Sequence, residues 1–195
     1  VSDESYSSVL TEKYWGFNKV LMGKSPLKLD RELSSYVMDN ILYKVSFPAE
    51  FHAQTAAEAA ISLSSEVKGK IDDIKEIKIF TQEPGVRIIS KKGPLNNFAD
   101  RDHCIEYIVA WCLLNGNLNS NSYSDSSASD ENIDKLRKLT NTVEDQAYTR
   151  SYYDLDERAI PNKVVVSMIT GEVYEKEVMY PCLLYTSPSP RDSRR

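Results

Sequence analysis

The chain has 195 residues and a formal net charge of −5, with 24 Lys and Arg against 29 Asp and Glu. Hydrophobic residues make up 41% and aromatic residues 10%, too many for a chain that is disordered throughout. The net negative charge argues against nucleic acid or an anionic membrane as partner, because neither is attracted to it. No apolar run approaches the roughly 18 residues of a membrane-spanning helix.

The cysteine and histidine content excludes several classes of site. Three cysteines cannot form a disulfide framework, and Cys104 and Cys112 lie in an apolar stretch, so we expect them to be reduced core residues. His52 and His103 are too few for a histidine-rich metal site, and no cysteine spacing fits structural zinc. The chain also lacks a Walker loop, a GxGxxG motif and a GxSxG elbow. We therefore expect no metal ion and no cofactor.

The first half of the chain predicts an amphipathic helix followed by a strand. Residues 2–30 mix polar and aromatic side chains without a period, which is typical of a segment that packs on another part of a protein. Alanine-rich spacing predicts a helix over 50–67 that ends at Gly69. Residues 76–81 alternate as a strand does, and Val86–Ile89 is its expected partner after the Pro84-Gly85 turn signal.

The second half predicts two more helices and a β-hairpin. A helix is expected from about Asp100 to Asn115-Gly116, with Asn97 or Asp100 as its cap. Residues 119–127 are expected to be a low-complexity polar connector, and Ser129 to cap the short helix that follows. Residues 163–169 and 173–180 predict a hairpin around Thr170-Gly171. Together these elements predict an α+β fold with a mainly antiparallel sheet packed with helices.

The end of the chain differs from everything before it. Residues 182–195 include Ser187-Pro188-Ser189-Pro190 and several arginines, with no apolar period. One interpretation is a basic tail that can be phosphorylated. We favour the other, a non-native tail left by cloning or assembly.

The first polar motif is the string Lys44–Thr55, KVSFPAEFHAQT. It places Lys44, Glu50, His52 and Gln54 around a helix start, where unpaired backbone N–H groups favour an anionic ligand. Lys44 and His52 would add positive charge. The alternative interpretation is that Glu50 is only a first-turn acid and His52 a surface ring.

The second polar motif runs from Asn96 to Tyr107. If this segment is helical from Asp100 onward, then Asp100, His103 and Tyr107 lie on one face, at i, i+3 and i+7. A carboxylate, an imidazole and a phenol on one stripe are suited to proton transfer or to binding a polyacid. The alternative is a solvated helix start with an Asp100–His103 pair.

The strings KVSFPAEFHAQT and KGPLNNFADRDHC (92–104) resemble the dehydratase branch of the MmgE/PrpD family. Shorter stretches such as YWGF (14–17) and MYP (179–181) agree, so the resemblance runs from about Ser8 to Pro181. It implies a protein about twice as long, in which a large helical domain precedes a smaller α+β domain and the active site lies between them. Residues 1–33 would then end the helical domain, 34–181 form the α+β domain, and 182–195 be the non-native tail.

The resemblance also implies a reaction, the loss of water from 2-methylcitrate to give 2-methyl-cis-aconitate in propionate breakdown, without an iron–sulfur cluster. It implies a small tricarboxylate substrate, a homodimer, and the mitochondrial matrix or bacterial cytoplasm as compartment, since a chain that starts at Val1 leaves the N-terminus open. Sister activities in the family are decarboxylation of cis-aconitate and epimerisation of small dicarboxylates. A further alternative is that this chain is only a non-catalytic, substrate-binding lid domain.

By the same resemblance, the functional residues fall in the two polar motifs. The catalytic candidates are His52, His103 and Tyr107, and Tyr107 matches a tyrosine of the family's second motif. The substrate-binding candidates are Lys44, Gln54, Asp100 and Arg101. Because other catalytic groups of the family belong to the helical domain, we expect this chain alone to be inactive.

Overall fold

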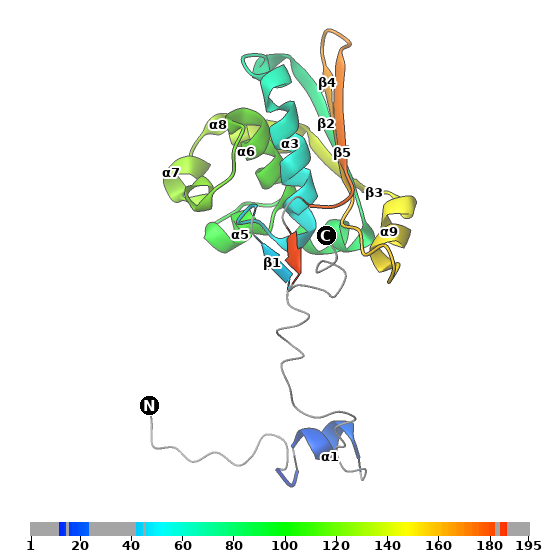
Figure 1. Cartoon of the computed structure of the whole chain (residues 1–195). Coiled ribbons are helices and arrows are strands. Elements are labelled where there is room, and N and C mark those ends of the chain that lie inside the picture. The colour runs from blue at the N-terminus through cyan, green and yellow to red at the C-terminus, as the bar shows by residue number, and fades with distance from the viewer. Residues whose placement is uncertain (1–11, 15, 24–41, 45, 182–183, 187–195) are drawn as a thin grey trace. The chain divides into compact units, whose positions relative to one another are not determined.

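The computed structural model describes residues 12–14, 16–23, 42–44, 46–181 and 184–186, without the side chains of 42–44 and 184–186. The chain divides into two units, Val1–Asn40 and Ile41–Arg195 (Figure 1). The described part of the first unit contains one short helix, α1 (Phe17–Leu21). Most of the predicted packing segment at residues 2–30 lies outside the described residues. All other helices and strands of the described residues belong to the second unit.

A four-stranded sheet organises the second unit. Its strands are β2 (Ile74–Thr81), β3 (Thr140–Glu144), β4 (Asn162–Met168) and β5 (Val173–Val178), in the order β3-β2-β4-β5. The β2–β4 and β4–β5 pairs are antiparallel, and only β2–β3 is parallel. The predicted α+β fold with a mainly antiparallel sheet is therefore confirmed.

Side-chain alternation fixes the register of the two central strands. Ile77 and Ile79 of β2 are fully buried, as are Val164 and Val166 of β4, with less buried residues between them. A shift of one residue would turn each buried set toward solvent, so the pairing is specified by the sequence. The predicted hairpin is also confirmed, and Gly171 adopts φ +95 in the turn between β4 and β5.

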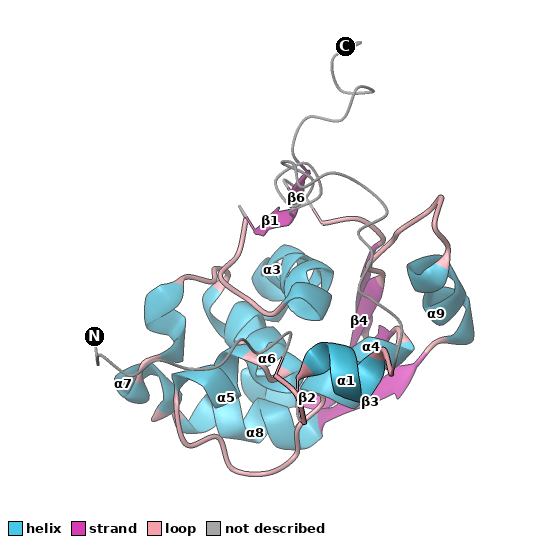
Figure 2. Cartoon of the chain, turned by 90° about the horizontal axis from the view of Figure 1, so that it is seen from below, coloured by secondary structure: helices cyan, strands magenta, loops and turns pink. Residues whose placement is uncertain are grey.

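Helices cover one face of this sheet. The helix α3 (Gln54–Val67), entered through the 3₁₀ turn η1 (Phe51–Ala53), lies between α6 (Ile105–Asn115) and the strands β4 and β5 (Figure 2). Its predicted stripe is buried, and the small side chains at Ala56 and Ala60 let the backbones approach closely. The helix α8 (Glu131–Leu139) packs against α6 and β2. The remaining short turn before the sheet is η2 (Ile71–Asp73).

The predicted strand at Val86–Ile89 is wrong, because this segment forms the helix α4 (Glu83–Ile89). Pro84 stands in the first helical turn, where its missing N–H leaves no bond unmade. Gly85 is required by close packing, since a Cβ there would lie 2.5 Å from Thr81 Oγ1. The Pro-Gly pair thus starts a helix instead of turning a hairpin, and β2 takes β3 as its neighbour instead.

The predicted single helix from Asp100 to Asn115 is also wrong, because the chain breaks within it. A short helix α5 (Phe98–Asp102) ends at His103, and Cys104 is extended, with φ −129 and ψ 105, before α6 begins. Asn97 caps α5 as predicted, since its Oδ1 accepts from the Asp100 N–H at 2.9 Å. Gly116 ends α6 with φ +68, again as predicted.

The segment expected to be a polar connector is folded. It forms η3 (Ser120–Tyr123) and α7 (Asp125–Ala128), and the Tyr123 side chain is fully buried. The cap of α8 is Asp130 and not Ser129, since Asp130 Oδ1 accepts from the Asn132 N–H at 2.9 Å. The side chain of Asp145 caps the last helix, α9 (Gln146–Tyr153).

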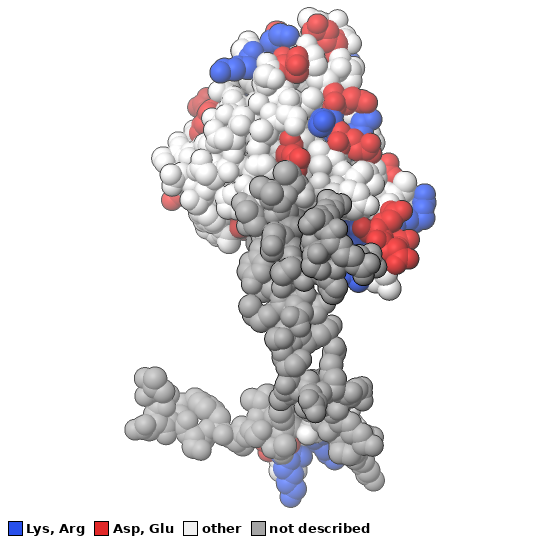
Figure 3. Space-filling model, in the orientation of Figure 1, with Lys and Arg blue, Asp and Glu red and all other residues white. Residues whose placement is uncertain are grey.

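A second, two-stranded sheet joins β1 (Leu42–Lys44) to β6 (Leu184–Thr186) in antiparallel pairing. Three residues of the predicted non-native tail therefore lie in a strand, and the tail's origin stays a prediction. On the face of the second unit seen in Figure 3, basic and acidic side chains gather near the top and on the right, and the left is mostly uncharged. Among the described residues, no helix is both long and apolar enough to cross a membrane.

Candidate functional site

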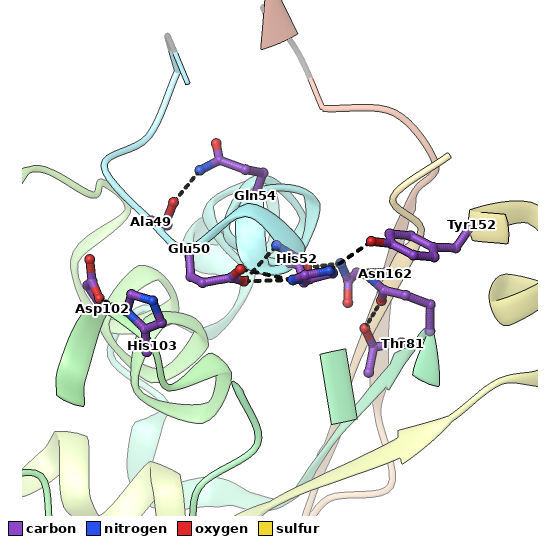
Figure 4. A network of polar contacts seen from close by, with 10 residues as sticks. Ala49, Glu50, His52, Gln54, Thr81, Asp102, His103, Tyr152 and Asn162 are labelled. Carbon is purple, nitrogen blue, oxygen red and sulfur yellow. Dashed lines mark hydrogen bonds and ion pairs between the residues drawn. The ribbon is translucent and has the colours of Figure 1, made fainter. Parts of the chain in front are cut away.

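The two polar motifs meet at the start of α3. The backbone N–H of Glu50 donates to the carbonyl of Asp102 at 3.3 Å, which joins the first motif to the second. The neighbouring strand ends are paired, Thr81 of β2 opposite Asn162 of β4. The helix α9 contributes Tyr152, whose hydroxyl points at His52 (Figure 4).

Glu50, His52 and Tyr152 form a continuous chain of hydrogen bonds. Nδ1 of His52 lies 2.9 Å from Glu50 Oε1 and 3.1 Å from Oε2, and Nε2 lies 3.1 Å from the Tyr152 hydroxyl. The Glu50 carboxylate also accepts from the His52 backbone N–H at 2.7 Å. His52 is only 8% exposed, so these contacts lie out of bulk water. The chain thus links a carboxylate, an imidazole and a phenol that are adjacent in space.

This arrangement suits proton transfer. A carboxylate on Nδ1 orients the ring and leaves Nε2 to exchange a proton with its other partner. Burial raises the pKa of Tyr152, and the neighbouring Tyr153 and Glu50 raise it further. Tyr152 therefore keeps its proton at neutral pH and is able to donate it.

Buried contacts hold the backbone of His52 in place. Asn162 Nδ2 donates to the His52 carbonyl at 2.8 Å and to Thr55 Oγ1 at 2.7 Å, and Asn162 is fully buried. The ring of His52 is flanked by Phe51, with centroids 5.6 Å apart, and by Tyr152, with centroids 5.5 Å apart. The imidazole is therefore fixed from the main chain and from both sides of the ring.

The first motif is thus a candidate site, and one alternative interpretation of it, a surface position for His52, is excluded. Glu50 is an acid at the helix start, as both interpretations of the sequence required, but a surface position for His52 is wrong because the ring is buried. Gln54 is 1% exposed, and its Nε2 donates to the carbonyls of Phe47 at 3.0 Å and Ala49 at 2.8 Å. It therefore holds the loop before the helix. Lys44 lies in β1, and its side chain is outside the described part of the structure.

The second motif does not form the predicted stripe. Because the chain breaks at His103 and Cys104, Asp100 and His103 belong to one short helix and its end, and Tyr107 to the next helix. Asp100 Oδ2 accepts from the Asn96 N–H at 3.0 Å, which closes the turn before α5. His103 is exposed, and its Nδ1 pairs with the neighbouring Asp102 instead of Asp100.

Arg101 and Tyr107 bind the fold around η3. Arg101 is 6% exposed, and its Nη1 lies 2.7 Å from both the Tyr123 carbonyl and Asp125 Oδ1. The Tyr107 hydroxyl donates to the Ser122 carbonyl at 2.7 Å, and burial raises the pKa of Tyr107 to about 12. Both side chains are thus turned to main-chain carbonyls inside the domain.

Tyr152 and Asn162 are the residues that sequence reasoning missed. Tyr152 lies 100 residues after His52, so no local spacing connects the two. Asn162 carried a weak signal, as a polar residue at the start of the valine-rich strand β4. A buried amide at a strand end indicates a specific hydrogen-bonding task.

The described residues therefore define an α+β domain that holds a buried acid–base chain at the start of a helix. Within these residues, no group of His, Cys, Asp and Glu is arranged to hold a metal ion. The chemistry that Glu50, His52 and Tyr152 themselves offer is proton transfer.

Comparison with known proteins gives the family of this domain. The MmgE/PrpD C-terminal domain matches residues 47–183, well over half of the chain. The chain belongs to the MmgE/PrpD family. The matched region contains His52, Tyr152 and Asn162, so the acid–base chain lies inside the family domain.

Curated relatives are similar over nearly the whole chain. The mitochondrial 2-methylcitrate dehydratase of Yarrowia lipolytica is 51% identical over 178 residues, which cover 89% of this chain and 34% of that protein. The 2-methylcitrate dehydratase of Escherichia coli is 47% identical over 180 residues, covering 90% of this chain and 37% of that protein. The Salmonella typhimurium protein of the same name is 48% identical with the same coverage. The chain spans about a third of the length of these relatives.

Proposed function

We propose that this chain is the C-terminal part of a hydro-lyase that dehydrates 2-methylcitrate to 2-methyl-cis-aconitate in the methylcitrate cycle. Relatives named for this activity are 47–51% identical to it, from bacteria and from a yeast. The observation that carries the proposal is the Glu50–His52–Tyr152 chain, because dehydration requires an acid for the leaving hydroxyl.

The proposed reaction needs two kinds of group, cations that stabilise negative charge and side chains that transfer protons. Removing a proton next to a carboxylate builds negative charge there, so cations must lie against the tricarboxylate. Lys44 is the proposed cation of the first motif. His52, backed by Glu50, is the centre of proton transfer, and the exposed His103 with Asp102 is a second candidate. Gln54, Asp100, Arg101 and Tyr107 act in this proposal by supporting the fold around these groups.

We propose that the complete protein is longer than this chain. The relatives are about three times the length of the matched region, and a helical domain would contribute the remaining catalytic groups. We further propose that the complete protein is a homodimer of the mitochondrial matrix or the bacterial cytoplasm, in line with the mitochondrial and bacterial relatives. The chain alone is then expected to be inactive.

The test is a turnover assay on the full-length protein. With 2-methylcitrate, the conjugated double bond of the product absorbs in the ultraviolet, and we expect steady formation of that product. The 195-residue chain, assayed at the same concentration, should give none. Release of carbon dioxide from cis-aconitate without dehydration of 2-methylcitrate would contradict the proposal and indicate the decarboxylase activity of the family.

A further inference from the structure

The environment of His52 limits how it can reach a substrate. Both ring nitrogens already have a partner, Glu50 on Nδ1 and Tyr152 on Nε2, and the residue is 8% exposed. A substrate atom would have to displace one of these partners to touch the ring. The Glu50 side is closed, because the same carboxylate also holds the backbone N–H of His52 at 2.7 Å.

Tyr152 is the partner on the open side. It is partly exposed, unlike His52, and it comes from α9 near the end of the sheet. A phenol accepts and donates at the same oxygen. When His52 is protonated, Nε2–H donates to the Tyr152 oxygen, and the Tyr152 O–H is then turned outward to a further acceptor. The phenol of the second polar motif, Tyr107, instead donates its hydroxyl proton to the Ser122 carbonyl.

We propose that Tyr152 is the catalytic residue that protonates the leaving hydroxyl, and that His52 acts on the substrate only through it. The inference rests on the proposed dehydration. As the carbon–oxygen bond breaks, its electron pair stays on oxygen, which takes the Tyr152 proton and leaves as water. The Nε2–H group of His52 then gives a proton to Tyr152, and His52 takes up a new proton from solvent. The carbon-bound proton leaves to a separate base, so one water is lost in each turnover.

The packing around Tyr152 supports this role. Its ring lies edge-on to Tyr153, with centroids 5.1 Å apart, and tilted against His52 at 5.5 Å. Tyr153 in turn donates to Glu83 at 3.2 Å. Two rings therefore hold the phenol while its hydroxyl carries no main-chain contact among the described residues. Tyr153 is the matched control, because it is an adjacent tyrosine on the same helix whose hydroxyl donates to Glu83 and does not face His52.

The experiment compares Tyr152→Phe with Tyr153→Phe in the full-length protein. Loss of a general acid lowers a rate by about 100-fold to 10,000-fold. We expect Tyr152→Phe to lower kcat for 2-methylcitrate by about 100-fold with KM nearly unchanged, and Tyr153→Phe to keep kcat within about threefold. A decrease below about tenfold, or one that Tyr153→Phe shares, overturns the inference. If the wild-type protein does not dehydrate 2-methylcitrate at all, the proposed function is what fails.

Two further readouts separate a relay from simple packing. In a relay, the double variant His52→Gln with Tyr152→Phe loses no more activity than the worse single variant, whereas independent roles multiply. In the 195-residue chain, ¹⁵N NMR should show a shift of the His52 Nε2 resonance in Tyr152→Phe and none in Tyr153→Phe. An unchanged Nε2 resonance, or multiplying losses, overturns the inference independently of the substrate assay.

Discussion

Two regions of this domain begin from the same kind of sequence motif and end in different roles. At the start of α3, Glu50, His52 and Tyr152 contact one another through side chains that each exchange protons. At the corner between α5 and α6, Arg101 and Tyr107 donate to main-chain carbonyls, which exchange no protons, and Arg101 also pairs with the exposed carboxylate of Asp125. The partner of a polar side chain, more than its own type, therefore separates a candidate site from a structural clamp.

The contacts of Arg101 and Tyr107 to main-chain carbonyls form a clamp, which explains why a serine- and asparagine-rich segment is folded. Residues 119–127 have little apolar surface, but Arg101 and Tyr107 donate to the carbonyls of Tyr123 and Ser122 in the middle of this segment, and the Tyr123 side chain is fully buried. Tyr123 stacks on Tyr107, with centroids 6.1 Å apart. If this comparison is correct, substitutions in the corner lower stability, whereas substitutions in the acid–base chain lower activity.

The largest stability effect is expected for Arg101→Ala in the 195-residue chain. It removes the bond to the Tyr123 carbonyl and the ion pair to Asp125, and leaves a buried carbonyl without its donor. Such losses reach about 3 kcal/mol of unfolding free energy, measurable by urea denaturation. Arg87→Ala is the control, because Arg87 forms an exposed ion pair with Glu83 and should leave the midpoint near wild type. Equal midpoints for both variants would contradict the clamp.

Glu106→Gln should have the next largest effect, and the effect should depend on pH. Burial alone would raise the pKa of Glu106, but hydrogen bonds from Ser90, Thr142 and the Lys91 backbone outweigh it, so the pKa is lowered from 4.5. The carboxylate therefore stabilises the fold above pH 4.5, and this contribution is lost as pH falls through the lowered value. At pH 7 we expect a loss of about 2 kcal/mol, because a Gln amide meets a donor at Lys91.

The check on Glu106 is a series of urea titrations between about pH 7 and pH 3. The gap between wild type and Glu106→Gln should narrow as the pH falls. Glu157→Gln, at an exposed position, should follow the wild-type curve throughout. A gap that stays constant with pH would show that the charge of Glu106 is not what stabilises the fold.

The smallest effect is expected for Tyr107→Phe. It removes one buried hydroxyl and leaves the Ser122 carbonyl unpaired while the ring stays in place. We expect a loss of about 1 kcal/mol of unfolding free energy. Tyr180→Phe, at an exposed ring, is the control. An unchanged stability in Tyr107→Phe would free this hydroxyl for another role and weaken the contrast between the two regions.

The sequence predicted those parts of the domain whose signals are local. The stripe through Ala56 and Ala60, the alternation in β2, and the turn at Gly171 each depend on residues within a few positions of one another. The break at Cys104 was missed because neither a proline nor a glycine marks it in the sequence. The helix α4 was missed because a Pro-Gly pair is compatible both with a turn and with a helix start.

The same limit applies to the candidate site. Glu50 and His52 are two positions apart, so their pairing at a helix start was within reach of the sequence. The contact from Tyr152 depends on α9 lying beside the end of β2, which the parallel β2–β3 pair brings about. The register between distant strands depends on the packing of the whole core, so no local sequence pattern predicts it.

The most direct test of the proton-transfer role is kcat of the full-length His52→Gln variant with 2-methylcitrate. Glutamine keeps a hydrogen-bonding side chain of similar size but cannot exchange a proton as imidazole does. The Glu50–His52–Tyr152 chain predicts a fall of about 100-fold or more, with the variant folded by circular dichroism. A kcat within about threefold of wild type would contradict it.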